Sequence, residues 1–187
     1  EQFAAKAGLL DANQKAIDLG YAYAKEHFTC PLPFRARTLD KTRDHIMIDG
    51  NTTAGLGCLF AGATVGAWYP ITPSTSVMDS FKRFCEKYRK DPETGKANYC
   101  IIQAEDELGA IGMVLGASWN GARSFTPTSG PGISLMNEFL GYGYFTEIPA
   151  VLFDVQRCGP STGMPTRTQQ ADLMACAYAS HGDTRHV

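Results

Sequence analysis

From residue 46 onward, short apolar runs alternate with longer segments that repeat apolar residues at helical spacing. The predicted strands are "TVGAWYPI", "YCIIQAE", "ARSFTPTS" and "IPAVLFDVQ". The predicted helices are "GNTTAGLGCLFAGA", "STSVMDSFKRFCEKY", "DELGAIGMVLGASWNG", "GPGISLMNEFLGYGYF" and "QQADLMACAYASHG". Strands that alternate with helices favour a parallel sheet covered by helices on both faces. We therefore expect an α/β fold for this region, with Asn51 as the N-cap of its first helix.

Residues 1–45 follow a different pattern. The stretch "NQKAIDLGYAYAKEHF" is predicted to be helical, and "TCPLPFRARTLDKTRD" combines two prolines with many charges, which is typical of a stiff, exposed linker. We expect one unit over residues 1–45 and a globular domain over residues 46–187. The sequence lacks an initiator Met and stops after the charged stretch "SHGDTRHV", so we expect a fragment of a longer chain with both ends missing, whose domain is truncated at its C-terminal end.

Composition excludes several classes of protein. The net charge of −2 gives no sign of nucleic acid or an anionic membrane as partner. No apolar run approaches the roughly 18 residues of a membrane span, and the first residues do not form a signal peptide, so we expect a cytoplasmic protein. The six cysteines show no C-x-x-C spacing for zinc or an iron–sulfur cluster. Four of them lie among apolar residues and are predicted to be buried: Cys58, Cys85, Cys100 and Cys176.

Irregular segments follow the predicted strands, at the edge of a parallel sheet where ligands bind. They are "YPITPS", "QAEDE", "TPTSGPG" and "QRCGPSTGMPTRT". In the first, Tyr69 and Thr72 each precede a proline, which biases both toward extended geometry. We expect a rigid turn that presents Thr72 in one fixed direction.

The second segment crowds Glu105, Asp106 and Glu107 at a strand-to-helix junction. Acidic residues in a first helical turn are favourable to the helix dipole, and this explains Glu105 and Asp106 as well as a functional role does. Glu107 differs, because the apolar stretch "LGAIGMVLGA" follows it at once. We expect its carboxyl group to be partly desolvated and suited to a ring nitrogen as partner.

The last two segments carry weaker signals. "TPTSGPGISL" could hold an anion at a helix start, but a plain helix start with Ser129 as N-cap and Pro131 near the first position is favoured. Arg157, at the end of a strand, could grip a carboxylate through two parallel hydrogen bonds. The alternative for Arg157 is a salt bridge to Asp154 or Glu107.

Taken together, "YPITPSTS", "QAEDELGAIG", "TPTSGPGISLMNE" and "DVQRCGPSTGMPTRTQQADL" resemble the alpha subunit of 2-oxoacid:ferredoxin oxidoreductases. In order and spacing they are similar to that family's pyrimidine-binding domain for thiamine diphosphate. The resemblance covers residues 46–183. The first 40 residues resemble, more weakly, the end of a gamma domain plus linker, as in members where gamma and alpha are fused.

The resemblance implies oxidative decarboxylation of a 2-oxoacid to acyl-coenzyme A and CO2 with reduction of ferredoxin, or the reverse. Thiamine diphosphate would carry the chemistry. Glu107 matches the glutamate that hydrogen-bonds the pyrimidine N1′, and Thr72 and Arg157 match positions that contact the substrate. The implied catalytic residues are therefore Glu107, Thr72 and Arg157. The implied cofactor-binding residues are Tyr69, Pro70, Ile71, Thr72 and Glu107.

The implied substrate-binding residues are Thr72, Arg157 and Thr166. Thr166 matches a position at the carboxylate end in 2-oxoglutarate-type members. Together with the apparent gamma–alpha fusion, it favours 2-oxoglutarate over pyruvate and branched-chain 2-oxoacids.

Two parts of such an enzyme are not found in the sequence. The stretch "IDGN" at residues 48–51 is too short for the family's magnesium motif and lies before the domain, and no cluster-binding cysteine pattern exists. The resemblance therefore implies a beta subunit that carries Mg2+ and an iron–sulfur cluster, in a dimer of heterodimers with ferredoxin or flavodoxin as acceptor. Two alternatives stay open: another class of thiamine enzyme, such as a decarboxylase or transketolase, and a non-catalytic interaction domain.

Overall fold

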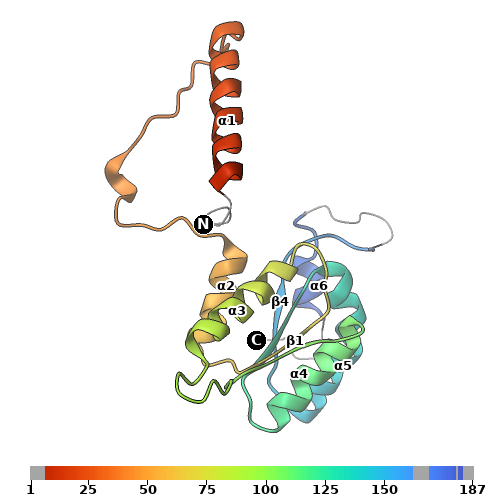
Figure 1. Cartoon of the computed structure of the whole chain (residues 1–187). Helices are drawn as coiled ribbons and strands as arrows, with labels where there is room; N and C mark the ends of the chain where they lie inside the picture. Colours follow the sequence, from red (N-terminus) through yellow and green to blue (C-terminus); the bar gives the residue numbers. More distant parts are fainter. Residues whose placement is uncertain (1–6, 162–168, 180, 183–187) are drawn as a thin grey trace. The chain divides into compact units, whose positions relative to one another are not determined.

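The computed structural model describes residues 7–161, 169–179 and 181–182, and the chain divides into two compact units, residues 1–46 and 47–187. The first unit contains helix α1 (Ala7–His27) and a short 3-10 turn, η1 (Asp40–Thr42) (Figure 1). Its helix was predicted from the apolar spacing. Its assignment to the end of a gamma domain remains a prediction.

The second unit is built on four parallel strands in the order β2-β1-β3-β4. These are β1 (Val65–Trp68), β2 (Cys100–Gln103), β3 (Ser124–Thr128) and β4 (Val151–Asp154). Val65 pairs with Cys100 on one side and Ser124 on the other, so β1 is an inner strand. The predicted α/β fold with a parallel sheet is confirmed.

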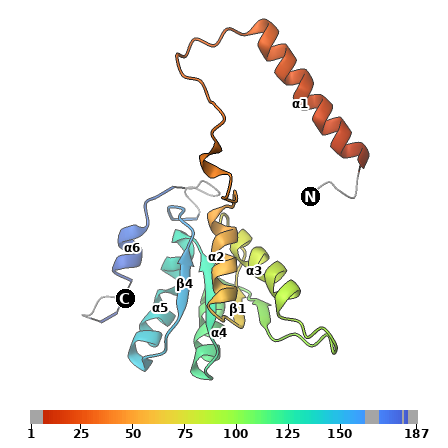
Figure 2. The ribbon, with the colours of Figure 1, turned by 90° about the vertical axis from the view of Figure 1, so that its left-hand side faces the viewer.

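Helices cover both faces of this sheet (Figure 1). Helices α2 (Gly50–Phe60) and α3 (Thr75–Tyr88) pack together on one face, and α4 (Glu107–Trp119) and α5 (Gly130–Thr146) pack together on the other. The short helix α6 (Leu173–Ala177) lies beside α5 (Figure 2). No described helix is both long and apolar enough to cross a membrane.

The sheet separates two hydrophobic clusters. The α2–α3 cluster is centred on Phe81 and Phe125, whose rings meet edge to face with centroids 4.8 Å apart. The α4–α5 cluster contains Ile111 and Met136, both fully buried. Burying one such side chain contributes about 1.5–3 kcal/mol. The glycine-rich α2 packs closely against α3, because a Cβ on Gly55 would lie 2.8 Å from two main-chain atoms of α3.

The N-cap of α2 differs from the prediction. Asp49, not Asn51, caps the helix, and its carboxylate accepts hydrogen bonds from the Thr52 N–H at 2.8 Å and the Thr52 hydroxyl at 2.6 Å. Asn51 instead donates from its amide to Pro73 O at 2.9 Å and to Ser76 Oγ at 2.8 Å. Both residue types make good caps, and the tertiary contact to the turn after β1 decides between them.

Strand β2, whose Cys100 was predicted to be buried, lies at an edge of the sheet, with Cys100 and Ile102 exposed. The prediction for the cysteines is therefore half right. Cys58 and Cys85 are buried, and burial raises the pKa of each thiol to about 11. Cys100 is exposed and Cys176 is only half-buried. An apolar run does not show on which side of a sheet a neighbouring strand will lie.

Candidate functional site

The carboxyl ends of the four strands bring the described parts of the predicted site segments to one edge of the sheet. In the turn after β1, Tyr69 and Ile71 are half-buried, whereas Pro70 and Thr72 are exposed. The Ser74 N–H and hydroxyl both donate to Ile71 O, at 2.8 Å and 2.9 Å. The main chain of this turn is therefore fixed by its own hydrogen bonds while the Thr72 side chain faces solvent.

Two other elements hold the carbonyl group of Thr72. Arg157 Nη1 donates to Thr72 O at 2.9 Å, and Ser129 Oγ donates to the same oxygen at 3.2 Å. The structure therefore brings Thr72 and Arg157 into contact, although they are 85 residues apart in the sequence. Ser129 is at the N-cap position of α5 as predicted, but its hydroxyl bonds the Thr72 carbonyl and does not cap the helix.

Arg157 is only 3% exposed. Its Nη2 donates to Ser161 Oγ at 3.0 Å, and its Nε is buried without a hydrogen-bond partner among the described residues. Within the described part of the chain, Arg157 forms no salt bridge to Asp154 or Glu107, which the sequence had left as an alternative. A guanidinium has five N–H donors, so this one keeps capacity for an anionic partner.

Glu107 is the first residue of α4 and is 6% exposed. Its neighbour Asp106 is the N-cap, with Oδ1 accepting from the Gly109 N–H at 2.6 Å, and Glu105 is exposed. Asp106 thus has the predicted capping role. No hydrogen bond or ion pair joins the Glu107 carboxyl group to any other described residue. The carboxyl oxygens are not among the fully enclosed atoms that lack a partner, so a ligand can reach them, and a mostly buried acid with an unpartnered carboxyl group marks a candidate ligand site.

The first turn of α5 lies between Glu107 and Arg157. A Cβ on Gly130 would lie 2.4 Å from Arg157 O and 2.6 Å from Asp172 Oδ2. A Cβ on Gly132 would lie 1.9 Å from Thr128 Oγ1 and 3.1 Å from Glu107 Cγ. Both positions require glycine because neighbouring residues occupy the space of a side chain.

Together with Ser129, these two glycines place Thr72, Glu107 and Arg157 around one short turn. The close approach of other segments to this turn was not predicted. The sequence showed its glycines but not what they touch.

Two acidic residues, Asp172 and Asp154, interact with each other, and Asp172 also contacts the main chain of Arg157. The Arg157 N–H donates to Asp172 Oδ2 at 3.2 Å, and Asp172 is 5% exposed. Burial raises the pKa of Asp154 to about 6, and the Asp172 carboxyl group adds to the rise. Cys176 Sγ donates to Asp154 Oδ2 at 3.2 Å, and burial together with this contact raises the pKa of its thiol to about 12. Sequence reasoning missed Asp172, because a single Asp after an irregular segment carries no distinctive signal.

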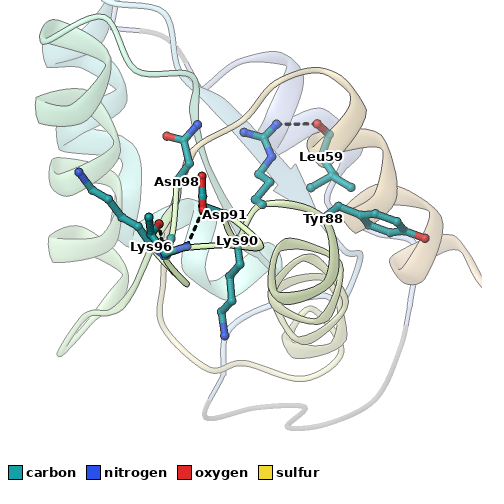
Figure 3. A pocket seen from close by; sticks show the side chains of 9 residues that line it. Leu59, Tyr88, Lys90, Asp91, Lys96 and Asn98 are labelled. Carbon is teal, nitrogen blue, oxygen red and sulfur yellow. Dashed lines mark hydrogen bonds between the residues drawn. The ribbon is translucent and has the colours of Figure 1, made fainter.

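Several cavities lie near the sheet, among them one at each end of its strands. One of about 740 Å³ is lined by residues at the ends of α2 and α3 and by the turn before β2, so it lies at the amino ends of the strands (Figure 3). Its polar groups hold that turn: Arg89 Nη2 donates to Leu59 O at 2.8 Å, and the Asp91 N–H donates to Lys96 O at 2.9 Å. A second cavity, of about 390 Å³, lies at the carboxyl ends and is lined by Asp154 and Gln156 among others. Neither is lined by Glu107.

Two further predictions concern Thr166 and the magnesium motif, and none of the contacts above involves them. Thr166 lies outside the described residues. Among the residues that the structure does describe, no group of three or more His, Cys, Asp and Glu side chains could hold a metal ion. In the stretch "IDGN", the Asp49 side chain is engaged in capping α2.

Comparisons with known proteins agree with this arrangement. Residues 56–185 match the family model described as pyruvate flavodoxin/ferredoxin oxidoreductase, thiamine diphosphate-binding. The chain is 46% identical over 136 residues to 2-oxoglutarate synthase subunit KorA of Methanocaldococcus jannaschii, covering 73% of this chain and 35% of that protein. It is 38% identical over 191 residues to 2-oxoglutarate oxidoreductase subunit KorA of Mycobacterium tuberculosis, covering 98% and 28%.

A solved structure is similar to the chain over nearly its whole length. It is 2-oxoglutarate:ferredoxin oxidoreductase from Magnetococcus marinus with 2-oxoglutarate, coenzyme A and succinyl-CoA bound. The TM-score is 0.76 at 39% sequence identity, with 98% of this chain and 31% of that chain covered. The chain thus spans about a third or less of the length of the relatives that it matches.

Proposed function

Because this chain belongs to the pyruvate flavodoxin/ferredoxin oxidoreductase family, in its thiamine diphosphate-binding part, we propose that it supplies the pyrimidine-binding half of a 2-oxoacid oxidoreductase site. The complete enzyme would oxidatively decarboxylate a 2-oxoacid to acyl-coenzyme A and CO2 and reduce ferredoxin, or run the reverse reaction. One observation carries the proposal: Glu107 is buried, and its carboxyl group has no partner among the described residues.

The residues around Glu107 fit the pyrimidine ring of thiamine diphosphate. The carboxyl group would hydrogen-bond the ring nitrogen N1′, and the lack of a side chain on Gly132 lets the first turn of α5 pack close to Glu107. When bound, this coenzyme supplies the electron sink needed to cleave the bond between a carbonyl carbon and a carboxylate. The task of Glu107 is to hold one proton at N1′. Its buried setting strengthens that hydrogen bond, because few water molecules compete for it.

Arg157 and Thr72 are proposed to hold the substrate. The Arg157 guanidinium retains donors beyond its bonds to Thr72 O and Ser161 Oγ, and a carboxylate is the partner that such a planar group binds best. The exposed Thr72 side chain would lie at the reacting carbon, while its carbonyl group is fixed by Arg157 and Ser129. Fixed geometry of this kind can supply roughly 7–11 kcal/mol of barrier lowering.

The substrate that we propose is 2-oxoglutarate. Two relatives are named for 2-oxoglutarate, and the similar solved structure was determined with it bound. Thr166 is the proposed contact at the distal carboxylate, and pyruvate and branched-chain 2-oxoacids are the alternatives.

We also propose partners for the chain. A beta subunit would hold Mg2+ and the iron–sulfur cluster, in a dimer of heterodimers in the cytoplasm. Coenzyme A would accept the acyl group, and ferredoxin or flavodoxin the electrons. Residues 1–45 would be the end of a gamma domain plus linker, fused to the domain of residues 46–187.

The test replaces Glu107 in the assembled complex with its beta partner. With coenzyme A present, Glu107→Gln should slow 2-oxoglutarate-dependent reduction of a low-potential dye by about 10²–10⁴-fold, the usual loss for a proton-transferring group. Glu105→Gln removes an exposed acid two residues away and should leave the rate unchanged. Size-exclusion chromatography checks that both variants assemble. An assembled Glu107→Gln enzyme with the wild-type rate would reject the role of Glu107.

A further inference from the structure

Thr128, the last residue of β3, is fully buried, and its Oγ1 has no hydrogen-bond partner among the described residues. A buried hydroxyl that is left without a partner lowers the stability of the folded chain. Val has nearly the same shape and a similar preference for strands, and it would avoid that cost. A hydroxyl at such a position is costly unless a polar group lies close by, and Thr128, unlike Thr126, lies at the end of the strand where a carboxyl group is near.

The neighbour that explains it is Glu107. The Cβ position of Gly132 lies 1.9 Å from Thr128 Oγ1 and 3.1 Å from Glu107 Cγ. These two distances from one point limit the separation between Thr128 Oγ1 and Glu107 Cγ to 5.0 Å at most. The carboxylate oxygens lie two bonds beyond Cγ, so rotation of the last torsions of Glu107 can bring an oxygen within hydrogen-bond distance of the hydroxyl.

We propose that Thr128 is a positioning residue for Glu107, whose hydroxyl donates a hydrogen bond to the Glu107 carboxyl group when the coenzyme ring is bound. This inference rests on the proposed function of Glu107. One carboxylate oxygen would face N1′ of the ring and the other would accept from Thr128. The absent Cβ of Gly132 leaves the space in which the two side chains meet. Thr128 would not touch the substrate.

Thr126 provides a matched control. It lies two residues earlier on the same strand and the same face, is also fully buried, and also has an Oγ1 without a partner among the described residues. It is roughly 6.6 Å deeper along the strand, so its hydroxyl lies farther from the end of the strand where Gly132 and Glu107 meet.

The experiment compares Thr128→Val, Thr128→Ser and Thr126→Val in the assembled complex. Thr128→Val should weaken thiamine diphosphate binding about 10- to 100-fold, the loss expected for a hydrogen bond to a charged group, as measured by titration calorimetry. Thr128→Ser should restore binding, and Thr126→Val should bind normally. Both Val variants should melt at the wild-type temperature or above it, because each removes an unpartnered buried hydroxyl. A Thr128→Val variant that binds the coenzyme weakly and also melts below wild type would have lost binding through a disturbed fold, which would overturn the proposal.

The remaining outcomes separate this inference from the proposed function. In a Glu107→Ala background, Thr128→Val should cause no further loss of binding. If the wild-type complex binds the coenzyme and Thr128→Val binds it equally well, the role of Thr128 is wrong and the proposed function stands. If the wild-type complex does not bind thiamine diphosphate, the proposed function itself fails.

Discussion

Gly132 offers a direct test of the geometry around Glu107. An alanine there would place its Cβ 1.9 Å from Thr128 Oγ1 and 3.1 Å from Glu107 Cγ. The first distance is shorter than any real contact of this kind, so either Thr128 or the first turn of α5 must move. Thr128 is fully buried and has little room to turn away.

The expected loss of stability follows from two opposing effects. Adding a methyl group to a filled core usually costs about 1–3 kcal/mol. Replacing glycine in a helix by alanine returns up to about 1 kcal/mol, because the unfolded chain loses freedom. A contact this short places the cost in the upper part of that range, about 2–3 kcal/mol, so after a gain of about 1 kcal/mol the net loss is about 1–2 kcal/mol. For a chain of this size, each kcal/mol lowers Tm by roughly 2–4 °C, so Gly132→Ala should melt roughly 2–8 °C below wild type.

Differential scanning calorimetry of the chain measures this change. Gly116→Ala is the control, because a Cβ on Gly116, in the neighbouring α4, would meet nothing within 4 Å, and this variant should be as stable as wild type or more stable. The double variant Gly132→Ala/Thr128→Ala removes the clashing oxygen and should recover most of the clash energy as a coupling between the two sites. An unchanged Tm for Gly132→Ala, or a loss that the second substitution does not relieve, would refute the proximity of Gly132, Thr128 and Glu107.

Three further predictions concern packing and titration. Gly55→Ala should cost roughly 1–3 kcal/mol in urea unfolding, because its Cβ would lie 2.8 Å from main-chain atoms of α3, whereas Gly57→Ala in the same helix meets open space and should cost nothing; equal costs would contradict the close packing of α2 on α3. The pKa of Asp154 is raised from 3.8 to about 6, so its contribution to stability is fully present below pH 3.8 and is lost as the pH rises through about 6. Urea unfolding at pH 4.5 and pH 7.5 should therefore show a smaller difference for Asp154→Asn than for wild type, and identical differences would show that Asp154 does not titrate in this range. At pH 8, iodoacetamide should modify the exposed Cys30 and Cys100 well before the buried Cys58 and Cys85, whose thiol pKa values are about 11; mass spectrometry that finds all four modified equally would contradict their burial.

Much of the fold could be predicted because the signals were local. Alternating apolar runs and helical spacing predicted the order of strands and helices, and a parallel sheet follows from that order. The lateral order of the strands could not be predicted in the same way. "YCIIQAE" is as apolar as an inner strand, yet β2 lies at the edge and Cys100 is exposed. Asn51 shows the same limit, since a tertiary contact outweighed its local preference for a cap.

The candidate site, like the fold, could be predicted from the sequence only in part. Glu107 was singled out because an apolar stretch follows it, and the structure buries it without a partner among the described residues. Its assigned role, like those of Thr72, Arg157 and Thr166, remains a prediction. The contacts of Gly130, Gly132, Thr128 and Asp172 could not be predicted, because each depends on two segments far apart in the sequence that meet in space. Spacing along the chain carries no information about such an encounter.

The sheet divides the domain into two largely independent halves. Phe81 and Phe125 belong to one hydrophobic cluster, whereas Glu107 begins the helix that packs in the other. Substitutions in separate clusters add in their effects on stability, since they share no neighbours. Side chains beneath α2 and α3 can therefore be exchanged during evolution, as long as their total volume is kept, without a compensating change in the α4–α5 face that carries Glu107.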